Sequence, residues 1–264
     1  MKIGIFDSGL GGLVIAKAIF KELPKYDYIY LGDTARVPYG NRSQQTIFEF
    51  TRQAVDFLFK QNCALIIIAC NTSSAMALRR IQREYLPKKY PNRRVLGVIV
   101  PTIEEIRNTP RKIGVLATTS TIKSHSYKKE LMKLNRQIKI FEQEAPLLVP
   151  LIENNTLKKS GDILKSYLKP MLAEKVDDIL LGCTHYPILK NAIKKIAGKK
   201  IKIISQEEII PGKLKTYLKR HPEIESKLSK KRERLFEVTD KNTNFDEVAK
   251  TLFGKKIKFK LVNY

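Results

Sequence analysis

Two stretches decide the fold of this chain: Ile66-Ile67-Ile68-Ala69-Cys70-Asn71-Thr72 and Ile179-Leu180-Leu181-Gly182-Cys183-Thr184-His185. In each, a short apolar run ends in a small residue, then a cysteine, then polar residues. Such a run predicts a buried strand with the thiol at its carboxyl end. Ligands bind at that end of the strands in open α/β sheets. Two such thiols facing one pocket would form a pair of acid/base groups that needs neither metal nor cofactor.

Strands alternate with amphipathic helices along most of the 264 residues, which indicates an α/β fold with a mostly parallel sheet. The expected strands are 2–6, 28–31, 64–69, 94–99, 112–116, 138–142, 179–181, 202–204 and 235–238. The expected helices are 13–21, 43–60, 74–84, 122–134, 161–172, 189–196, 211–219 and 246–253.

A weak internal repeat suggests two related halves. Lys2-Ile3-Gly4-Ile5-Phe6 is echoed 110 residues later by Lys112-Ile113-Gly114-Val115-Leu116, and Cys70 and Cys183 lie 113 residues apart. Chance is an alternative, because five residues make a short match. If the repeat is real, the chain forms two pseudo-symmetric lobes, each a mostly parallel sheet flanked by helices, with the active site in the cleft between them. We expect the first lobe to comprise 1–97 plus 208–264 and the second 98–207.

The chain is strongly basic, with 50 Lys and Arg against 26 Asp and Glu and a formal charge of +24. This charge permits nucleic-acid binding, but the sequence shows no zinc-finger spacing and no aromatic–basic single-strand motif. A lysine-rich surface, or steering of an anionic substrate, explains the charge without a further partner. Specific nucleic-acid binding is therefore not expected.

No apolar run is long enough to cross a bilayer, and the first seven residues are typical of a strand rather than of a signal peptide. The three cysteines show no disulfide spacing, which favours reduced thiols. We therefore expect a cytoplasmic protein without membrane association.

Two polar segments follow the first two strands. Asp7-Ser8-Gly9-Leu10-Gly11-Gly12 allows close backbone approach to an anionic ligand, with a structural turn as the alternative. Its spacing is neither a dinucleotide fingerprint nor a P-loop. Asp33-Thr34-Ala35-Arg36-Val37-Pro38-Tyr39-Gly40 contains a Pro-Tyr-Gly turn whose aromatic ring could line a pocket, while Asp33 and Arg36 could simply pair.

The thiols admit other interpretations. Cys63 has no polar sequel and is predicted to be a structural core residue that precedes its strand. Three Cys and three His without CxxC or HxxxH spacing argue against a metal site. A Cys-His hydrolase would use Cys183 and His185 but would leave Cys70 unexplained. His125 and His221 are expected on the solvated surface.

Taken in order, these segments resemble the glutamate racemases of the cofactor-independent aspartate/glutamate racemase family. The resemblance is carried by residues 7–12, 33–40, 69–72 (Ala-Cys-Asn-Thr), 97–101 (Gly-Val-Ile-Val-Pro), 117–124 and 182–187 (Gly-Cys-Thr-His-Tyr-Pro). It covers residues 1 to about 190, whereas the tail is poorly marked.

The resemblance implies interconversion of L- and D-glutamate without a cofactor, supplying D-glutamate for peptidoglycan, cell-wall biogenesis and cell shape. It implies that Cys70 is the base toward D-glutamate and Cys183 toward L-glutamate. Asp7 and His185 would tune the thiols, and Glu153 would assist on the second-lobe side. The implied substrate contacts are Asp7, Ser8, Tyr39, Gly40, Asn71, Thr72, Thr184 and His185. Relatives are often dimers, so a homodimer is possible.

The chain departs from the family's pattern after residue 204. Relatives often carry Asp-Ser at the positions of Ser205-Gln206. An aspartate racemase of the same superfamily remains an alternative, and a basic nucleic-acid-binding protein is the alternative from a different class.

Overall fold

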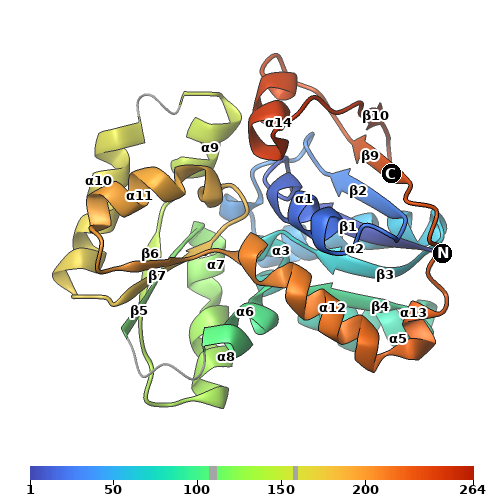
Figure 1. The fold of residues 1–264 in the computed structure, drawn as a ribbon, viewed down its shortest axis with the longest axis horizontal. Helices are drawn as coiled ribbons and strands as arrows, with labels where there is room; N and C mark the ends of the chain where they lie inside the picture. Colours follow the sequence, from blue (N-terminus) through green and yellow to red (C-terminus); the bar gives the residue numbers. More distant parts are fainter. Residues whose placement is uncertain (107–111, 157–159) are drawn as a thin grey trace.

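Two parallel β-sheets form the centre of the computed structural model, which describes residues 1–106, 112–156 and 160–264 (Figure 1). The six-stranded sheet has the order β10 (Lys260–Leu261), β9 (Arg234–Val238), β2 (Tyr28–Gly32), β1 (Lys2–Asp7), β3 (Cys63–Ile68), β4 (Arg94–Gly97). The four-stranded sheet has the order β6 (Lys139–Glu144), β5 (Lys112–Ala117), β7 (Asp178–Gly182), β8 (Lys202–Ile204). The predicted α/β class with parallel sheets is confirmed.

The second sheet repeats the strand order of the first. The order β2-β1-β3-β4 corresponds to β6-β5-β7-β8, so each sheet has the same topology. β1 and β5 begin 110 residues apart, at Lys2 and Lys112, and both cysteines directly follow or closely follow the equivalent strands β3 and β7. The short sequence repeat therefore reflects two pseudo-symmetric sheets. β9 returns to the first sheet beside β2, as expected for the tail.

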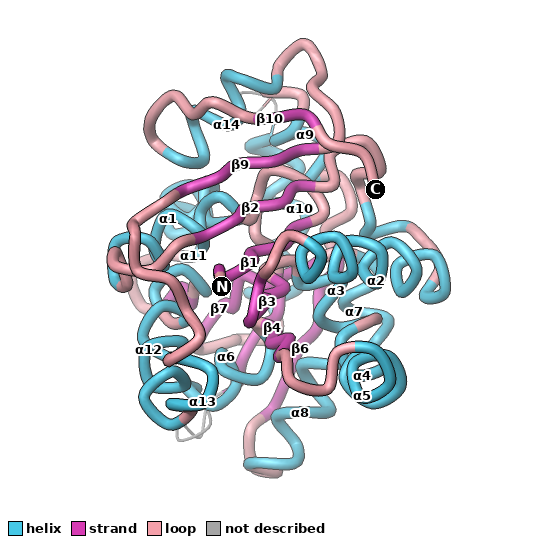
Figure 2. Tube along the Cα trace, turned by 90° about the vertical axis from the view of Figure 1, so that its right-hand side faces the viewer, coloured by secondary structure: helices cyan, strands magenta, loops and turns pink. Residues whose placement is uncertain are grey.

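Helices cover both faces of each sheet (Figures 1 and 2). Those around the first sheet are α1 (Leu13–Glu22), α2 (Gln44–Lys60), α3 (Asn71–Met76), α4 (Leu78–Arg80), the π-helix η2 (Ile81–Tyr85), α5 (Leu86–Lys89), α12 (Ile210–Arg220), α13 (Pro222–Glu225) and α14 (Phe245–Phe253). Those around the second are α6 (Ile99–Ile106), α7 (Thr119–Ser124), α8 (Ser126–Leu134), α9 (Leu148–Glu153), α10 (Ser160–Ala173) and α11 (Lys190–Ala197). Single 3₁₀ turns are η1 (Tyr39–Asn41), η4 (Tyr186–Leu189) and η5 (Gln206–Glu208).

Alternating side chains along the strands produce these layers. In β1, Ile3 and Ile5 pack with residues of α1, α12 and α14, whereas Phe6 packs on the opposite face with α2. Successive strand residues point to opposite faces, so a strand buried on both sides is apolar throughout. The second sheet is likewise covered by α9, α10 and α11 on one face and by α6 and α8 on the other.

Some predicted boundaries were wrong. The helix expected at 122–134 is two helices, because His125 between them has the left-handed φ of 51°. The helix expected from residue 74 begins at Asn71, because the Cys70 side chain accepts the Ser73 N–H and caps it. The strand expected at 94–99 ends at Gly97, and Ile99 begins α6. Short apolar runs suit strand and helix equally, so such errors are expected.

Cys63 was expected to precede its strand, but it is the first residue of β3. It is fully buried as predicted, and burial raises its pKa to about 12. His125 and His221 lie on the exposed surface beside Glu142 and Glu223, respectively.

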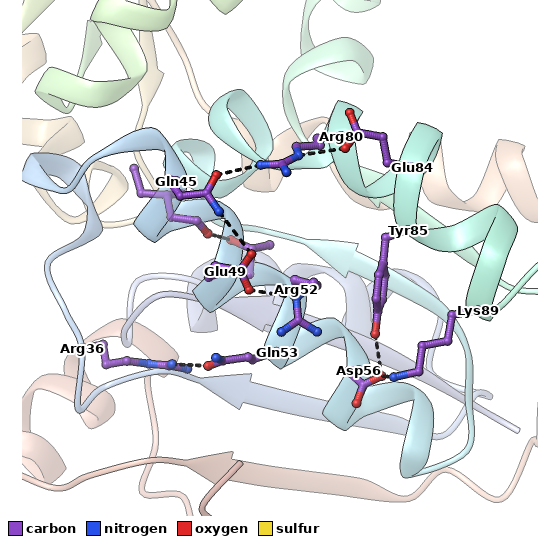
Figure 3. A network of polar contacts seen from close by, with 12 residues as sticks. Arg36, Gln45, Glu49, Arg52, Gln53, Asp56, Arg80, Glu84, Tyr85 and Lys89 are labelled. Carbon is purple, nitrogen blue, oxygen red and sulfur yellow. Dashed lines mark hydrogen bonds and ion pairs between the residues drawn. The ribbon is translucent and has the colours of Figure 1, made fainter.

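Polar contacts attach α2 to the helical segment that follows α3 (Figure 3). Arg80 bonds to Gln45 and Glu84, and Asp56 accepts hydrogen bonds from Tyr85 and Lys89. Arg36, in the loop after β2, donates a hydrogen bond to Gln53 of α2. In the described part of the chain, no helix is both long and apolar enough to span a membrane.

Candidate active site

The carboxyl ends of β1, β3 and β7 meet at one small cavity of about 20 Å³, and both Cys70 and Cys183 line it. The two thiols thus come from different sheets but face the same space. Seven of the other predicted site residues line the same cavity: Ser8, Tyr39, Gly40, Asn71, Thr72, Thr184 and His185. Asp7 and Glu153 do not line it, but each contacts a residue that does.

Cys70 sits in a hydroxyl-rich setting at the start of α3. Its Sγ lies 3.3 Å from Ser8 Oγ and accepts the backbone N–H of Ser73 at 3.4 Å. Burial and the nearby Asp7 carboxylate raise the pKa of the thiol, and the hydrogen bonds from Ser8 and Ser73 oppose this effect only in part. Cys70 is therefore held toward its neutral form.

Cys183 lies beside a buried ion pair. His185 Nδ1 is 3.8 Å from Cys183 Sγ, and its Nε2 is 2.6 Å from Glu153 Oε1. Burial alone would lower the pKa of His185, but the contacts to Cys183 and Glu153 raise it well above its usual value. Glu153 is buried too, yet its bond to His185 lowers its pKa. An imidazolium that donates both N–H groups thus joins the thiol to the carboxylate.

Asp7 connects the two halves of the site. One carboxylate oxygen accepts the Gly9 N–H at 3.1 Å, and the other accepts the Thr184 hydroxyl at 3.2 Å. Asp7 is fully buried, and this burial raises its pKa, against the charge of His185 and the hydrogen bonds. Asp7 thus contacts the Cys183 segment through Thr184 while its charge acts on Cys70.

The glycine-rich turn after β1 allows these groups to approach. A Cβ added at Gly11 would lie 2.5 Å from His185 Nδ1 and 2.6 Å from Thr184 Oγ1. One added at Gly9 would lie 2.8 Å from Glu153 Oε1. Leu10, between them, donates its N–H to Glu153 at 3.3 Å. The turn packs against the ion pair of the second sheet, while its Ser8 lines the cavity, and anion binding by the turn stays a prediction.

Tyr39, the tyrosine predicted to line a pocket, is held by hydrogen bonding within its own loop. Tyr39 donates its hydroxyl to Asp33, which also accepts from Arg36 Nε at 2.6 Å. Both alternatives for this segment are therefore realised: Asp33 and Arg36 pair, and the aromatic residue lines the cavity. Gly40 comes so close to the second sheet that an added Cβ would lie 2.8 Å from Thr118 Cβ.

Sequence reasoning missed two kinds of site residue. Thr118 lines the cavity and lies 2.9 Å from Thr72, but it was noted only as part of a matching segment. Gln206 lies behind the cavity and pairs with Asn71 at 2.7 Å. The departure at Ser205-Gln206 was the only signal that this turn matters.

The cavity is small. Its volume of about 20 Å³ has room for roughly one water molecule. A larger hollow of about 550 Å³, between α4, α6, α8 and α12, contains neither cysteine, so size does not identify the chemistry. Within residues 1–106, 112–156 and 160–264, no cluster of three or more His, Cys, Asp or Glu is arranged to hold a metal ion.

Comparisons with known proteins agree with this geometry. The family model described as Asp/Glu/Hydantoin racemase matches residues 14–208. A glutamate racemase from Aquifex aeolicus (strain VF5) is 36% identical over 268 residues, covering 100% of this chain and 98% of the relative.

Two solved structures are similar along nearly their whole length. A glutamate racemase isoform from Bacillus anthracis has a TM-score of 0.89 at 33% identity, covering 99% of this chain and 97% of the other. A glutamate racemase from Francisella tularensis subsp. tularensis SCHU S4, solved in complex with D-glutamate, has a TM-score of 0.89 at 34% identity with the same coverage.

Proposed function

The chain belongs to the Asp/Glu/hydantoin racemase family, and from this premise we propose that it interconverts L-glutamate and D-glutamate. The observation that carries the proposal is the pair of thiols from two different sheets at one cavity. Inverting a carbon centre needs a base on one face and a proton donor on the other. Two similar groups can exchange these roles when the configuration of the substrate is reversed.

The proposed reaction is a balanced proton exchange. The thiolate of one cysteine takes the α-proton of glutamate and becomes a thiol. The thiol of the other cysteine gives its proton to the opposite face and becomes a thiolate. No group is oxidised or reduced, and the pair ends poised for the opposite enantiomer.

The surroundings of the thiols indicate which one starts as the base. Burial and the Asp7 carboxylate raise the pKa of the Cys70 thiol, whereas Cys183 Sγ lies 3.8 Å from His185 Nδ1. The enzyme would then rest with Cys183 as base and Cys70 as donor, ready for L-glutamate.

Glu153 and Asp7 have indirect roles in this proposal. Glu153 keeps His185 charged and oriented through the 2.6 Å bond to Nε2. Asp7 holds Thr184 in place and biases Cys70 toward the thiol. Substrate contacts would come from the cavity residues Ser8, Tyr39, Gly40, Asn71, Thr72, Thr184 and His185. Their hydroxyl and N–H groups suit the carboxylates of an acidic amino acid.

The product of the proposed reaction, D-glutamate, has a use in the cell. D-Glutamate would serve peptidoglycan synthesis in the cytoplasm, where the three free, buried cysteines stay reduced. Lobe limits at 1–97 plus 208–264 and 98–207, and assembly as a homodimer, stay predictions.

The decisive test is circular dichroism of L-glutamate incubated with the purified, reduced protein and no added cofactor. L-Aspartate is followed in parallel. Loss of the glutamate signal alone is the expected result. Loss of the aspartate signal alone would support the two-thiol mechanism but identify aspartate, rather than glutamate, as the substrate. If neither signal decays with folded protein, the proposal is wrong, and salt-dependent nucleic-acid binding becomes the next assay.

A further inference from the structure

A buried polar cluster lies behind the candidate active site, where the chain leaves β8. It consists of Asn71 at the start of α3, Thr102 on α6, Tyr127 on α8 and Gln206 at the start of η5. The four side chains are between 0% and 3% exposed. Buried polar groups are stable only when they are hydrogen-bonded, so the orientation of each one is restricted.

Asn71 and Gln206 form a reciprocal amide pair across 135 residues of sequence. Asn71 Nδ2 donates to Gln206 Oε1 at 2.7 Å, and Gln206 Nε2 donates to Asn71 Oδ1 at 3.0 Å. Each amide therefore uses both its donor and its acceptor on the other.

The two hydroxyl groups of the cluster decide which way the Gln206 amide points. Tyr127 donates its one hydrogen to Asn71 Oδ1 at 2.6 Å, and Thr102 donates its hydrogen to the Val98 carbonyl at 2.6 Å. Both hydroxyl oxygens can then only accept, and Gln206 Nε2 lies 2.9 Å from the Tyr127 oxygen and 3.3 Å from the Thr102 oxygen. Its two hydrogens serve these oxygens and Asn71 Oδ1 together, so the longest contact, to Thr102, shares a hydrogen with another. The reverse orientation of the amide would place Oε1 against two oxygens with no hydrogen to give.

The Thr102 hydroxyl also sets the orientation of Asn71, because a joint reversal of both amides would place Gln206 Oε1 against the Thr102 oxygen, whose hydrogen is donated to Val98. In the observed orientation Asn71 Oδ1 accepts two hydrogen bonds, from Tyr127 and Gln206. Its Nδ2 gives one hydrogen to Gln206, and no acceptor for the second hydrogen lies among the described residues. Asn71 lines the cavity, so a free N–H donor is available to a bound anion.

We propose that Gln206 is a positioning residue, which locks the Asn71 side chain so that it offers an N–H rather than a carbonyl oxygen to a carboxylate of the substrate. The identity of that substrate rests on the proposed function. A carboxylate only accepts hydrogen bonds, so the opposite orientation of Asn71 would repel it. Tyr127 supports the same orientation from the second lobe.

The test is a kinetic comparison of wild type with Gln206→Met, a substitution of similar shape without donor or acceptor. Asn71 would bind glutamate equally before and during proton transfer, so we expect KM to rise about tenfold with kcat little changed. Asn71→Ala should raise KM similarly. The double variant should be no worse than Asn71→Ala, because Gln206 acts through Asn71.

The matched control is Gln82→Met. Gln82 is a half-buried glutamine that donates to the Val95 carbonyl at 2.8 Å and does not line the cavity, so its loss should leave KM unchanged. If Gln206→Met does not fold, Tyr127→Phe removes only one hydroxyl and should raise KM about threefold. An unchanged KM in these variants, or effects of Gln206→Met and Asn71→Ala that simply add, would overturn the positioning role.

A second readout does not depend on racemisation. In the unliganded protein, NMR should show that the Asn71 side-chain hydrogen donated to Gln206 is protected from exchange, and Gln206→Met should remove that protection. A protein that fails to racemise glutamate but shows this loss contradicts the proposed function and supports the locked orientation. An active enzyme whose Asn71 amide is unaffected by Gln206→Met contradicts the locked orientation alone.

Discussion

The two cysteines have opposite electrostatic neighbours. Cys183 lies 3.8 Å from the charged His185, whereas Cys70 lies among hydroxyl groups near the Asp7 carboxylate. Two identical residues in one cavity thus have different electrostatic surroundings. That difference suits the proposed reaction, which begins with one thiolate and one thiol.

Replacing either thiol tests this division of work. Cys70→Ser and Cys183→Ser should each lower racemisation by about 10²- to 10⁴-fold, because a hydroxyl is a far poorer proton acceptor than a thiolate. Each variant should keep some exchange of the α-proton in deuterated water for one enantiomer, measured by NMR.

Cys63→Ala is the matched control. Cys63 is buried at the start of β3 and does not line the cavity, so activity should be close to wild type. Full activity in a Cys70 or Cys183 variant, or a large loss in a folded Cys63 variant, would show that the wrong pair was assigned.

The His185–Glu153 pair predicts a pH-dependent contribution to stability. The raised pKa of His185 gives stability that is complete below its unfolded value near 6.5 and is lost as pH rises through the folded value. The lowered pKa of Glu153 gives stability that is present above its unfolded value near 4.3 and is lost toward acid. The pair therefore contributes most between about pH 4.5 and 6.5.

We expect Glu153→Gln to lower the free energy of unfolding by about 3 kcal/mol at pH 5.5, because it leaves a buried charge without its partner. Urea unfolding should show a smaller difference from wild type at pH 9.5. Glu223→Gln, which breaks the exposed pair with His221, should change little at either pH. A Glu153→Gln penalty that grows with pH would contradict the assigned charges.

At the scale of elements, the turn between β1 and α1 brings the two sheets together. Its Gly9 and Gly11 have no side chain where Glu153 and His185 approach from the second sheet. Glu153 and His185 can pack closely against this turn because its glycines have no Cβ atoms. The turn therefore sets the distance between the two halves of the site.

Gly11→Ala should lower racemisation by at least about 100-fold, because the added Cβ would lie 2.5 Å from His185 Nδ1 and must displace it. Racemisation and thermal melting measured together separate a lost site from a lost fold. Gly212→Ala in α12 is the control: nothing lies within 4 Å of its added Cβ, so activity should stay and stability should rise by about 0.5–1 kcal/mol. Unchanged activity in Gly11→Ala would contradict the role of the turn.

At the scale of the whole molecule, the chain carries a formal charge of +24. A positive field raises the rate at which an anion reaches the protein without changing the reaction inside. The large positive charge can thus serve to attract an anionic substrate, and no nucleic-acid partner is needed to explain it.

This predicts a specific salt dependence. Between about 20 and 200 mM KCl, kcat/KM for glutamate should fall several-fold while kcat stays nearly constant, since salt screens long-range attraction more than contacts in a buried site. Steady-state kinetics at constant pH measure both. A flat kcat/KM profile would contradict steering, and an equal fall in kcat would indicate an effect on the protein itself.

The sequence by itself determined the features that depend on neighbouring residues. The apolar runs before Cys70 and Cys183 predicted strands, and the small and polar residues after them predicted thiols at strand ends. The echo of residues 2–6 at 112–116 predicted the repeated sheet. Such features are local, because burial, strand period and turn chemistry act over a few residues.

Only the tertiary structure decided which distant residues meet. It placed Glu153 on His185, Asp7 on Thr184, and Gln206 on Asn71 across 135 residues of sequence. It also decided that the cavity is small and that the glycine turn meets the ion pair. These contacts depend on how two lobes pack, and packing is determined by the shapes of all the surfaces together rather than by any single stretch of chain.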